Sequence, residues 1–253
     1  MSKMVIIQSL LLNQYEEIIF GFSTKISADR KPPYYFNVST SVGDDEKIVQ
    51  GNRELFFHEL GLKTESVAIQ KQVHGDKINY INKGGFCGES DAMITDKKNL
   101  GLAISTADCT PIFIFDKKNK IIAAVHSGWR GTEKKILLKV LNKLKEEYDS
   151  SPQELIVYIG PSICQKNYEV GKEVAEKFEQ KYLIPKVRKD SFGGDKYLLD
   201  VSGINYDILL EFKIPEENVQ LSSYCTFEMK YLLHSYRRDG LHSGRALGII
   251  AMR

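Results

Sequence analysis

Five consecutive apolar residues at 121–125 (IIAAV) constrain the fold of this chain more than any other segment. Neighbouring side chains of a β-strand point to opposite faces, so a strand that is apolar at every position must be covered on both faces. The clearest helix follows this run. We expect Thr132 to be its N-cap, and one apolar stripe lies opposite a row of lysines. The stripe consists of Ile136, Leu137, Val140, Leu141 and Leu144. This pattern predicts a central strand followed by an amphipathic helix.

Short runs rich in β-branched residues predict further strands, and apolar periodicity predicts further helices. Strands and helices alternate without a strict βαβ rhythm, which favours a mixed α/β or α+β fold in a single domain spanning residues 1–253. The segment 24–45 contains Pro32-Pro33 and little periodicity, and we expect a surface loop over the site. The expected strands are 5–8, 18–22, 66–70, 112–115, 120–125, 155–159 and 246–251; the expected helices are 46–60, 172–182 and 201–212.

The overall charge excludes an electrostatic argument for nucleic acid or for an anionic membrane. The 253 residues include 35 basic and 33 acidic ones, for a formal charge of +2. No run approaches the roughly 18 apolar residues that a membrane span needs. The N-terminal residues lack the long apolar region of a signal peptide, so we expect a cytoplasmic protein.

The chain has four cysteines and five histidines, the residue types that most often carry metal or nucleophile chemistry. None of the cysteines belongs to a C-x-x-C pair, and in a cytosolic chain we expect buried thiols, ligands or nucleophiles rather than disulfides. The cysteines are Cys87, Cys109, Cys164 and Cys225.

His126 ends the central strand and precedes a glycine-flanked turn, a position that commonly faces a ligand crevice in α/β proteins. The turn also offers backbone N–H groups at a helix start and the side chain of Arg130, which suit a phosphate or carboxylate. A purely structural turn with a solvated arginine explains the same residues.

Asp108 and Cys109 lie between two apolar runs, where burial without partners is costly. On an extended backbone they point to opposite faces, so they share one site only if the chain bends there. His74 follows a predicted strand and precedes a glycine. The separations of 35 residues (74 to 109) and 17 residues (109 to 126) match no local metal motif. Two imidazoles and a thiolate would nevertheless leave the fourth position of a zinc ion open, as in catalytic sites.

A set of motifs over nearly the whole chain resembles the multicopper polyphenol oxidase, or laccase-domain, family, whose members are described as purine nucleoside phosphorylases. The motifs are GFST (21–24), VGDD (42–45), QVHG (72–75), DAMIT (91–95), TADCTP (106–111), AVHSGWRGT (124–132), GPSI (160–163), YEVG (168–171), SYRRDG (235–240) and GR (244–245).

The resemblance implies a layered α/β/β/α fold with mixed sheets and a zinc site made by His74, Cys109 and His126. It implies phosphorolysis of adenosine, inosine, guanosine and methylthioadenosine, with adenosine deamination as a second activity. The expected partners are therefore purine nucleosides and phosphate. We expect Asp108 to transfer a proton or to orient a ligand histidine. The residues expected to bind substrate or phosphate are Gln72, Arg130, Arg237 and Arg238.

Two features depart from the family pattern. Lys25 stands where the family usually has an arginine, and a lysine lacks the bidentate fork. Leu232-Leu233-His234 also replaces a more aromatic approach to the SYRR motif at 235–238. Separately, the H-x-E and P-C-x-x-C signature of zinc deaminases is missing, so deamination would need different residues.

Three other functions remain open from the sequence. Copper-dependent phenol oxidation usually needs more histidines, often in H-x-H pairs, so copper is the less favoured metal. A hydrolase could use Cys109 as its nucleophile with a histidine base. A non-enzymatic domain could bind a partner through Trp129 and the arginines. The sequence leaves the oligomeric state open.

Overall fold

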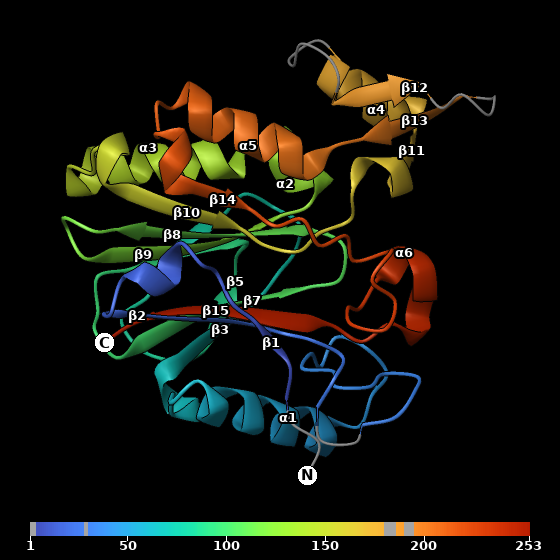
Figure 1. Ribbon diagram of the computed structural model, residues 1–253, viewed down its shortest axis with the longest axis horizontal. Helices are drawn as coiled ribbons and strands as arrows, with labels where there is room; N and C mark the ends of the chain where they lie inside the picture. Colours follow the sequence, from blue (N-terminus) through green and yellow to red (C-terminus); the bar gives the residue numbers. More distant parts are fainter. Residues whose placement is uncertain (1–3, 28–29, 180–185, 190–194) are drawn as a thin grey trace.

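The computed structural model describes residues 4–27, 30–179, 186–189 and 195–253. Its helices and strands form four layers: two β-sheets lie face to face, and helices cover the outer face of each (Figure 1). The predicted mixed α/β fold with α/β/β/α layers is confirmed.

The first sheet has six strands of mixed direction, in which the C-terminal strand pairs antiparallel with both of its neighbours. In spatial order the strands are β1 (Ile6–Ile7), β2 (Ile18–Ser23), β15 (Ala246–Met252), β7 (Leu100–Thr106), β3 (Val67–Lys71) and β5 (Gly85–Glu89).

The second sheet also has six strands, and the predicted central strand lies within it, paired on both sides. A small three-stranded sheet lies beyond it (Figure 1). The second sheet is ordered β14 (Val219–Leu221), β10 (Leu155–Ile159), β8 (Thr110–Asp116), β9 (Ile121–Ser127), β6 (Ala92–Thr95) and β4 (Ile78–Tyr80); the small sheet is ordered β11 (Glu169–Gly171), β13 (Lys196–Leu199) and β12 (Val187–Lys189).

The apolar run of β9 is buried on both faces, as its sequence predicts. Ile121, Ala123 and Val125 belong to the core between the second sheet and its helices. Ile122 and Ala124 belong to the core between the two sheets. In that inner core the ring of Phe20 meets Phe113 and Tyr158 edge to face, with centroids 5.0 and 5.1 Å apart. Such pairs add to the stabilisation from burial alone.

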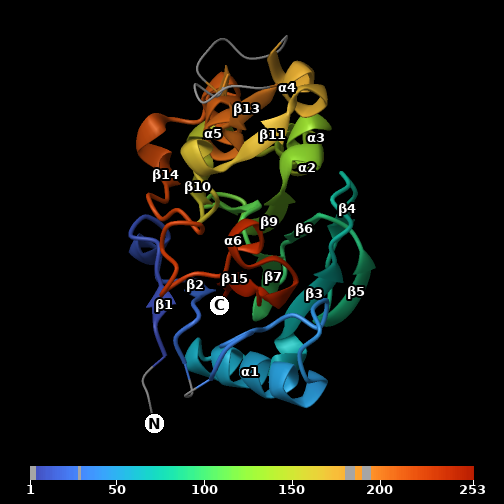
Figure 2. The same ribbon diagram turned by 90° about the vertical axis from the view of Figure 1, so that its right-hand side faces the viewer.

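Helices cover the two outer faces. On one side, α1 (Glu46–Glu59) packs on the first sheet through Phe56 and Phe57. On the other side, the helices cover the second sheet (Figures 1 and 2). They are α2 (Trp129–Glu133), α3 (Ile136–Tyr148) and α5 (Val201–Glu211). Helix α4 (Lys172–Glu179) packs against the small three-stranded sheet, and the short α6 (Tyr236–Asp239) lies near one end of the sheets.

The helix after β9 differs from its prediction at the start. Thr132 is not an N-cap; it lies inside α2, and Lys135 with φ of 59° separates α2 from α3. A left-handed residue cannot continue an α-helical hydrogen-bond ladder, so the segment breaks into two helices. The predicted apolar stripe is nevertheless completely buried in α3.

The other predicted elements agree with the structure to within one or two residues, except where the structure gives no description. Residues 180–182 of the helix predicted at 172–182 lie outside the described residues, as do residues 28 and 29 of the predicted loop. Strands β6 and β7, which lie next to site residues, are not among the predicted strands. None of the described helices is long and apolar enough to cross a membrane.

Candidate metal centre

His126 lies at the end of β9, and strand pairing places a carboxylate beside its ring. Ala92 pairs with Val125 across β6 and β9, so Asp91 lies opposite His126. The backbone N–H of His126 donates to the Asp91 carbonyl over 2.7 Å. The imidazole Nδ1 lies 2.8 Å from Asp91 Oδ1. Both residues are buried, so this pair fixes the ring and leaves Nε2 for another partner.

The same carboxylate holds the loop that carries His74. Asp91 accepts the backbone N–H groups of Val73 (3.2 Å), His74 (3.0 Å) and Gly75 (2.7 Å). His74 has a φ of 57°, a conformation that needs local support in a residue with a Cβ. Its ring meets that of His126 edge to face, with centroids 4.9 Å apart. One buried carboxylate therefore positions both histidines.

Cys109 reaches the histidines because the chain bends before it. Asp108 has a φ of 95°, so the sequence between β7 and β8 turns sharply instead of continuing as one strand. Thr110 then pairs with Ser127 across β8 and β9, which places Cys109 beside Gly128. The ligand atoms of His74, Cys109 and His126 all lie within 4.8 Å of one another. We call these three residues the His-Cys-His cluster.

The His-Cys-His cluster fits a metal ion in donor type, in access and in the space left for it. His126 is buried, Cys109 is partly exposed and His74 is exposed, so the cluster opens to solvent on one side. A Cβ atom at Gly128 would lie 2.9 Å from Cys109 Sγ and 3.4 Å from His74 Cδ2. Glycine thus keeps the space between these two side chains clear. Two imidazoles and a thiolate suit a borderline-soft divalent ion.

Without a metal ion, Cys109 and His126 stabilise each other as an ion pair. Burial raises the pKa of the Cys109 thiol, but the charge of His126 and hydrogen bonds from both histidines lower it to about 6. Burial lowers the pKa of His126, but the Cys109 thiolate and Asp91 raise it to about 9. The cluster therefore carries a thiolate at neutral pH, the form in which cysteine ligates metals or attacks electrophiles.

Asp108 lies next to Cys109, but its carboxylate faces other groups. Thr226 Oγ1 donates to Oδ1 over 2.6 Å, and the backbone N–H of Arg237 donates to Oδ2 over 2.7 Å. The residue that orients a cluster histidine is Asp91, where the sequence analysis offered Asp108. Asp108 instead ties the bend before Cys109 to the segments that carry Thr226 and Arg237.

Two of the arginines expected to bind phosphate are exposed and stacked on aromatic rings. The Arg130 guanidinium lies 4.4 Å from the Trp129 ring centroid, and that of Arg237 lies 5.0 Å from the Tyr168 ring. Burial raises the pKa of Tyr168, and the negative charge of Cys109 raises it further, whereas Arg237 and Arg130 oppose the increase. Both arginines and Cys109 are thus close enough to act on the same tyrosine.

The other two expected substrate residues are engaged within the fold. Arg238 donates to the carbonyls of Thr226, Phe227 and Leu233 and pairs with Asp239. The amide of Gln72 bridges to the backbone of Ser105 through both of its ends. Neither side chain is therefore presented to a ligand in this structure.

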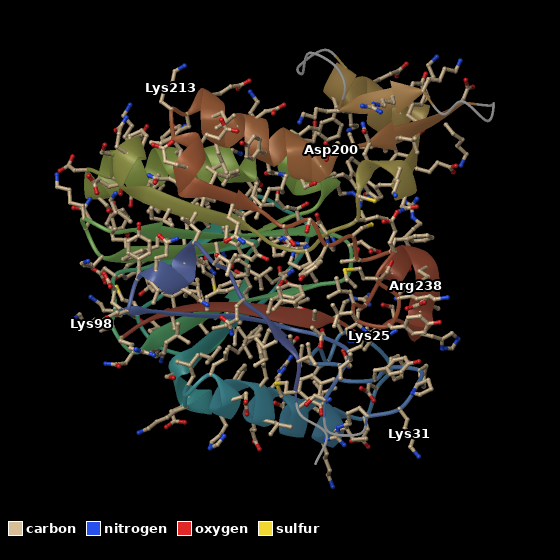
Figure 3. All side chains as sticks on the ribbon, in the orientation of Figure 1. Lys25, Lys31, Lys98, Asp200, Lys213 and Arg238 are labelled. Carbon is tan, nitrogen blue, oxygen red and sulfur yellow. The ribbon has the colours of Figure 1, made fainter. Side chains whose placement is uncertain are left out.

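Lys25, which replaces the family's usual arginine, is also part of the fold. Its ammonium group lies 4.1 Å from the Tyr35 ring centroid and 3.9 Å from Asp239. It also donates to the Lys230 carbonyl. Lys25 and Arg238 lie on the same side of the molecule, near α6 (Figure 3).

Three residues around the cluster are not among those predicted from the sequence. Asp91 had a signal, since it is a charged residue directly before the apolar run of β6. Tyr168 and Arg245 lie within family motifs, but their spacing in the sequence does not predict that they lie near the cluster. Burial lowers the pKa of Arg245, and the charges of Asp108 and Cys109 raise it. Its Nη1 donates to the carbonyls of Ser243 and Gly244. It stacks on Tyr236, with its central carbon 5.3 Å from the ring centroid.

Comparisons with known proteins agree with this architecture. The chain is 33% identical over 250 residues to a purine nucleoside phosphorylase of Bacteroides thetaiotaomicron, covering 93% of this chain and 92% of the relative. It is 34% identical over 219 residues to a purine nucleoside phosphorylase of Clostridium acetobutylicum, covering 85% and 86%. The crystal structure of YlmD from Geobacillus stearothermophilus superimposes with a TM-score of 0.90 at 27% identity, covering 97% of this chain and 94% of that chain. Residues 19–253 match the family model described as multi-copper polyphenol oxidoreductase laccase, and the chain belongs to that family.

Proposed function

We propose that this chain is a zinc-dependent purine nucleoside phosphorylase with a second, adenosine deaminase activity. The observation that carries the proposal is the His-Cys-His cluster, with three donor atoms within 4.8 Å, a buried carboxylate behind it and solvent on one side. The names of the relatives supply the reaction class. The proposed substrates are adenosine, inosine, guanosine and methylthioadenosine.

His74, Cys109 and His126 would hold the zinc ion, and Asp91 would keep the His126 ring and the His74 backbone in place. A bound zinc ion would supply a Lewis acid that polarises a substrate oxygen or a water molecule. Because Cys109 already carries a thiolate near neutral pH and His126 holds a proton, loading the metal should release that proton.

Arg130, Arg237 and Arg245 are the groups proposed to bind the phosphate. Each guanidinium is stacked on an aromatic ring, which limits its motion and reduces the entropy lost when it binds an anion. In phosphorolysis, a phosphate oxygen forms the new bond to C1′ of the ribose while the C1′–N bond to the base breaks. The electron pair of that bond leaves with the base, which takes up a proton. The arginines would then hold the ribose 1-phosphate product.

Deamination would use the same cluster on a different substrate carbon. Water adds to C6 of adenosine and ammonia leaves, which yields inosine. Asp91, the carboxylate beside the histidines, already takes part in four hydrogen bonds, so another group would move the protons in this reaction.

The test combines metal analysis with nucleoside turnover. We expect purified protein to hold about one zinc ion per chain and to convert inosine to hypoxanthine and ribose 1-phosphate only with phosphate present. Cys109→Ala should lose both the zinc and the turnover. Cys87→Ala is the matched control and should keep both, because Cys87 lies on β5 outside the cluster. Equal product from the wild type and Cys109→Ala would refute the mechanism.

A cysteine hydrolase is the second candidate, and the thiolate–imidazolium pair of Cys109 and His126 specifically favours it. The two functions differ in their response to a chelator. A hydrolase would keep its activity after metal removal and would lose it on alkylation of Cys109. The phosphorylase should lose activity on metal removal and regain it with zinc. Copper-dependent phenol oxidation would instead require copper and molecular oxygen.

A further inference from the structure

Two other cysteines meet on segments that are far apart in sequence. Ser162 pairs with Cys225 in an isolated parallel bridge, and the backbone N–H of Thr226 donates to the Ser162 carbonyl over 3.0 Å. The backbone N–H of Cys164 then donates to Cys225 Sγ over 3.2 Å. Both cysteines are free thiols, and their sulfur atoms lie within 4.8 Å of each other and of a Glu228 oxygen. We call Cys164, Cys225 and Glu228 the dithiol cluster.

We propose that Cys164 and Cys225 are a modification site, at which a reversible disulfide forms and changes the position of Asp108 beside Cys109. A disulfide needs sulfur atoms about 2.05 Å apart and Cα atoms usually about 4.4–6.8 Å apart. The backbone bridge between Ser162 and Cys225 holds the two segments side by side with the sulfur atoms within 4.8 Å, and we expect rotation of the two side chains to close the remaining distance.

The two thiols differ in pKa, as expected for a pair in which one cysteine attacks the oxidant and the other then attacks the oxidised sulfur. Burial raises the pKa of both. For Cys225, hydrogen bonds from Cys164 and Asn167 and from backbone N–H groups outweigh burial and lower it. For Cys164, the effect of burial prevails and raises the pKa to about 11. Cys225 therefore supplies the attacking thiolate and Cys164 the resolving thiol.

The proposed oxidant is a hydroperoxide. The Cys225 thiolate attacks one peroxide oxygen and the O–O bond breaks, giving a sulfenic acid at Cys225 and a hydroxide that takes up a proton. Cys164 then attacks the sulfur of the sulfenic acid. The S–S bond forms, the S–O bond breaks, and hydroxide leaves and combines with the Cys164 proton as water. The two thiols lose two electrons to the peroxide, and an external dithiol reverses the change.

Each cysteine neighbours a residue that holds Asp108. Ile163, directly before Cys164, donates its backbone N–H to the Asp108 carbonyl over 3.0 Å. Thr226, directly after Cys225, donates its hydroxyl to Asp108 Oδ1 over 2.6 Å. Asp108 in turn forms the bend that places Cys109. A disulfide between Cys164 and Cys225 should therefore shift the two hydrogen bonds that Ile163 and Thr226 donate to Asp108. Since Asp108 forms the bend that places Cys109, the shift should reach the His-Cys-His cluster.

The side chains around Cys164 and Cys225 favour a disulfide over a second metal site. Asn167 Nδ2 lies 3.1 Å from Cys164 Sγ, 3.6 Å from Cys225 Sγ and 2.8 Å from Glu228 Oε1. The space between the three acceptors is thus filled by an amide donor. Glu228 also pairs with the Lys166 ammonium over 2.7 Å, and this positive charge disfavours a divalent cation.

The test treats the zinc-loaded protein with hydrogen peroxide, alkylates the remaining thiols and maps the peptides by mass spectrometry. We expect a peptide pair joined through residues 164 and 225, formed with the loss of two hydrogens and reversed by dithiothreitol. Cys164→Ser should give no such pair. Cys87→Ser is the matched control and should give it as the wild type does.

Three results would overturn the proposal. One is oxidation of Cys109 or Cys87 while residues 164 and 225 remain alkylatable. Another is a second equivalent of metal that protects both thiols and is lost in Cys164→Ser. The third is formation of the disulfide with no change at the His-Cys-His cluster, measured as zinc affinity by chelator competition.

The effect on turnover rests on the proposed phosphorylase function and is measured separately. Oxidation should lower kcat for inosine phosphorolysis severalfold in the wild type and in Cys87→Ser, but not in Cys164→Ser. If no variant turns over inosine but the disulfide forms and changes zinc affinity, the proposed function fails and the modification site stands.

Discussion

The His-Cys-His cluster and the dithiol cluster both offer three donor atoms within 4.8 Å, yet their surroundings differ. Behind the first lies Asp91, a fully buried carboxylate whose hydrogen bonds fix two of the three donors. In the second, the carboxylate is itself a member of the cluster, is exposed, and pairs with Lys166. We therefore expect a metal ion at the first cluster and not at the second. A group that orients the donors and leaves space between them distinguishes the first cluster.

The largest expected effect concerns the space between the donors of the first cluster. Gly128→Ala would place a Cβ 2.9 Å from Cys109 Sγ, closer than side chains normally approach. We expect loss of bound zinc by metal analysis and loss of phosphorolysis. Gly51→Ala is the control: a Cβ there meets nothing within 4 Å, and the residue lies inside α1, so the protein should stay loaded and become slightly more stable. A fully loaded, active Gly128→Ala protein would show that the open space is irrelevant.

The reactivity of the partly exposed cysteines should also separate the clusters in metal-free protein. Near pH 7 a thiol of pKa about 6 is mostly thiolate, whereas one of pKa about 11 is almost entirely protonated. Since a thiolate of lower pKa is also less nucleophilic, we expect Cys109 to react with iodoacetamide roughly 30- to 90-fold faster than Cys164. The Cys109 rate should rise with pH through about pH 6 and then level off. Peptide mapping against time measures both rates, and equal rates at pH 7 would contradict the assignment of the ion pair.

The next prediction compares the carboxylate of Asp91, which supports the His-Cys-His cluster, with that of Glu228 in the dithiol cluster. Asp91→Asn keeps the shape but removes the negative charge that fixes His126, and we expect zinc affinity to fall about 10- to 100-fold. The matched substitution Glu228→Gln should leave the affinity unchanged. Competition with a chromophoric chelator measures both. If the two variants weaken zinc binding equally, the distinction drawn between the clusters is wrong.

The smallest effect is expected at Thr226, which follows Cys225 of the dithiol cluster and donates to Asp108 beside Cys109. Thr226→Val removes the hydroxyl that donates to Asp108 and keeps the side-chain volume. A hydrogen bond to a charged group contributes about 1.5–3 kcal/mol, so we expect a modest loss of stability in denaturant unfolding and a severalfold lower kcat. Zinc content should be normal. Unchanged kcat with reduced stability would limit Thr226 to a structural role and would weaken the proposed coupling between the clusters.

Much of the fold was predictable because buried strands and helices show regular patterns of apolar residues in the sequence. The fully apolar run of β9 predicts a strand covered on both faces, and the stripe of α3 predicts its buried side. The break at Lys135 was not predictable, since an exposed lysine in the left-handed region leaves no compositional signal.

The site was predictable only in part. The donors could be named from their chemistry and from the family motifs, but their convergence depends on strand register and on the bend at Asp108, which local spacing does not encode. The same limit explains why Arg238 was grouped with Arg237. Adjacent residues on α6 share a sequence context, yet the Arg238 guanidinium donates to three carbonyls, whereas that of Arg237 is exposed and donates to one.

The position of Asp91 also bears on how the chain folds. The β6–β9 register brings Asp91 to the backbone and ring of His126, and these strands also carry the inner core. The cluster is therefore complete only when β6 and β9 have paired. A ligand that binds the native state and not the unfolded chain shifts the folding equilibrium toward the native state. Added zinc should accordingly raise the melting temperature of the whole chain, so that metal affinity reports on completion of the second sheet.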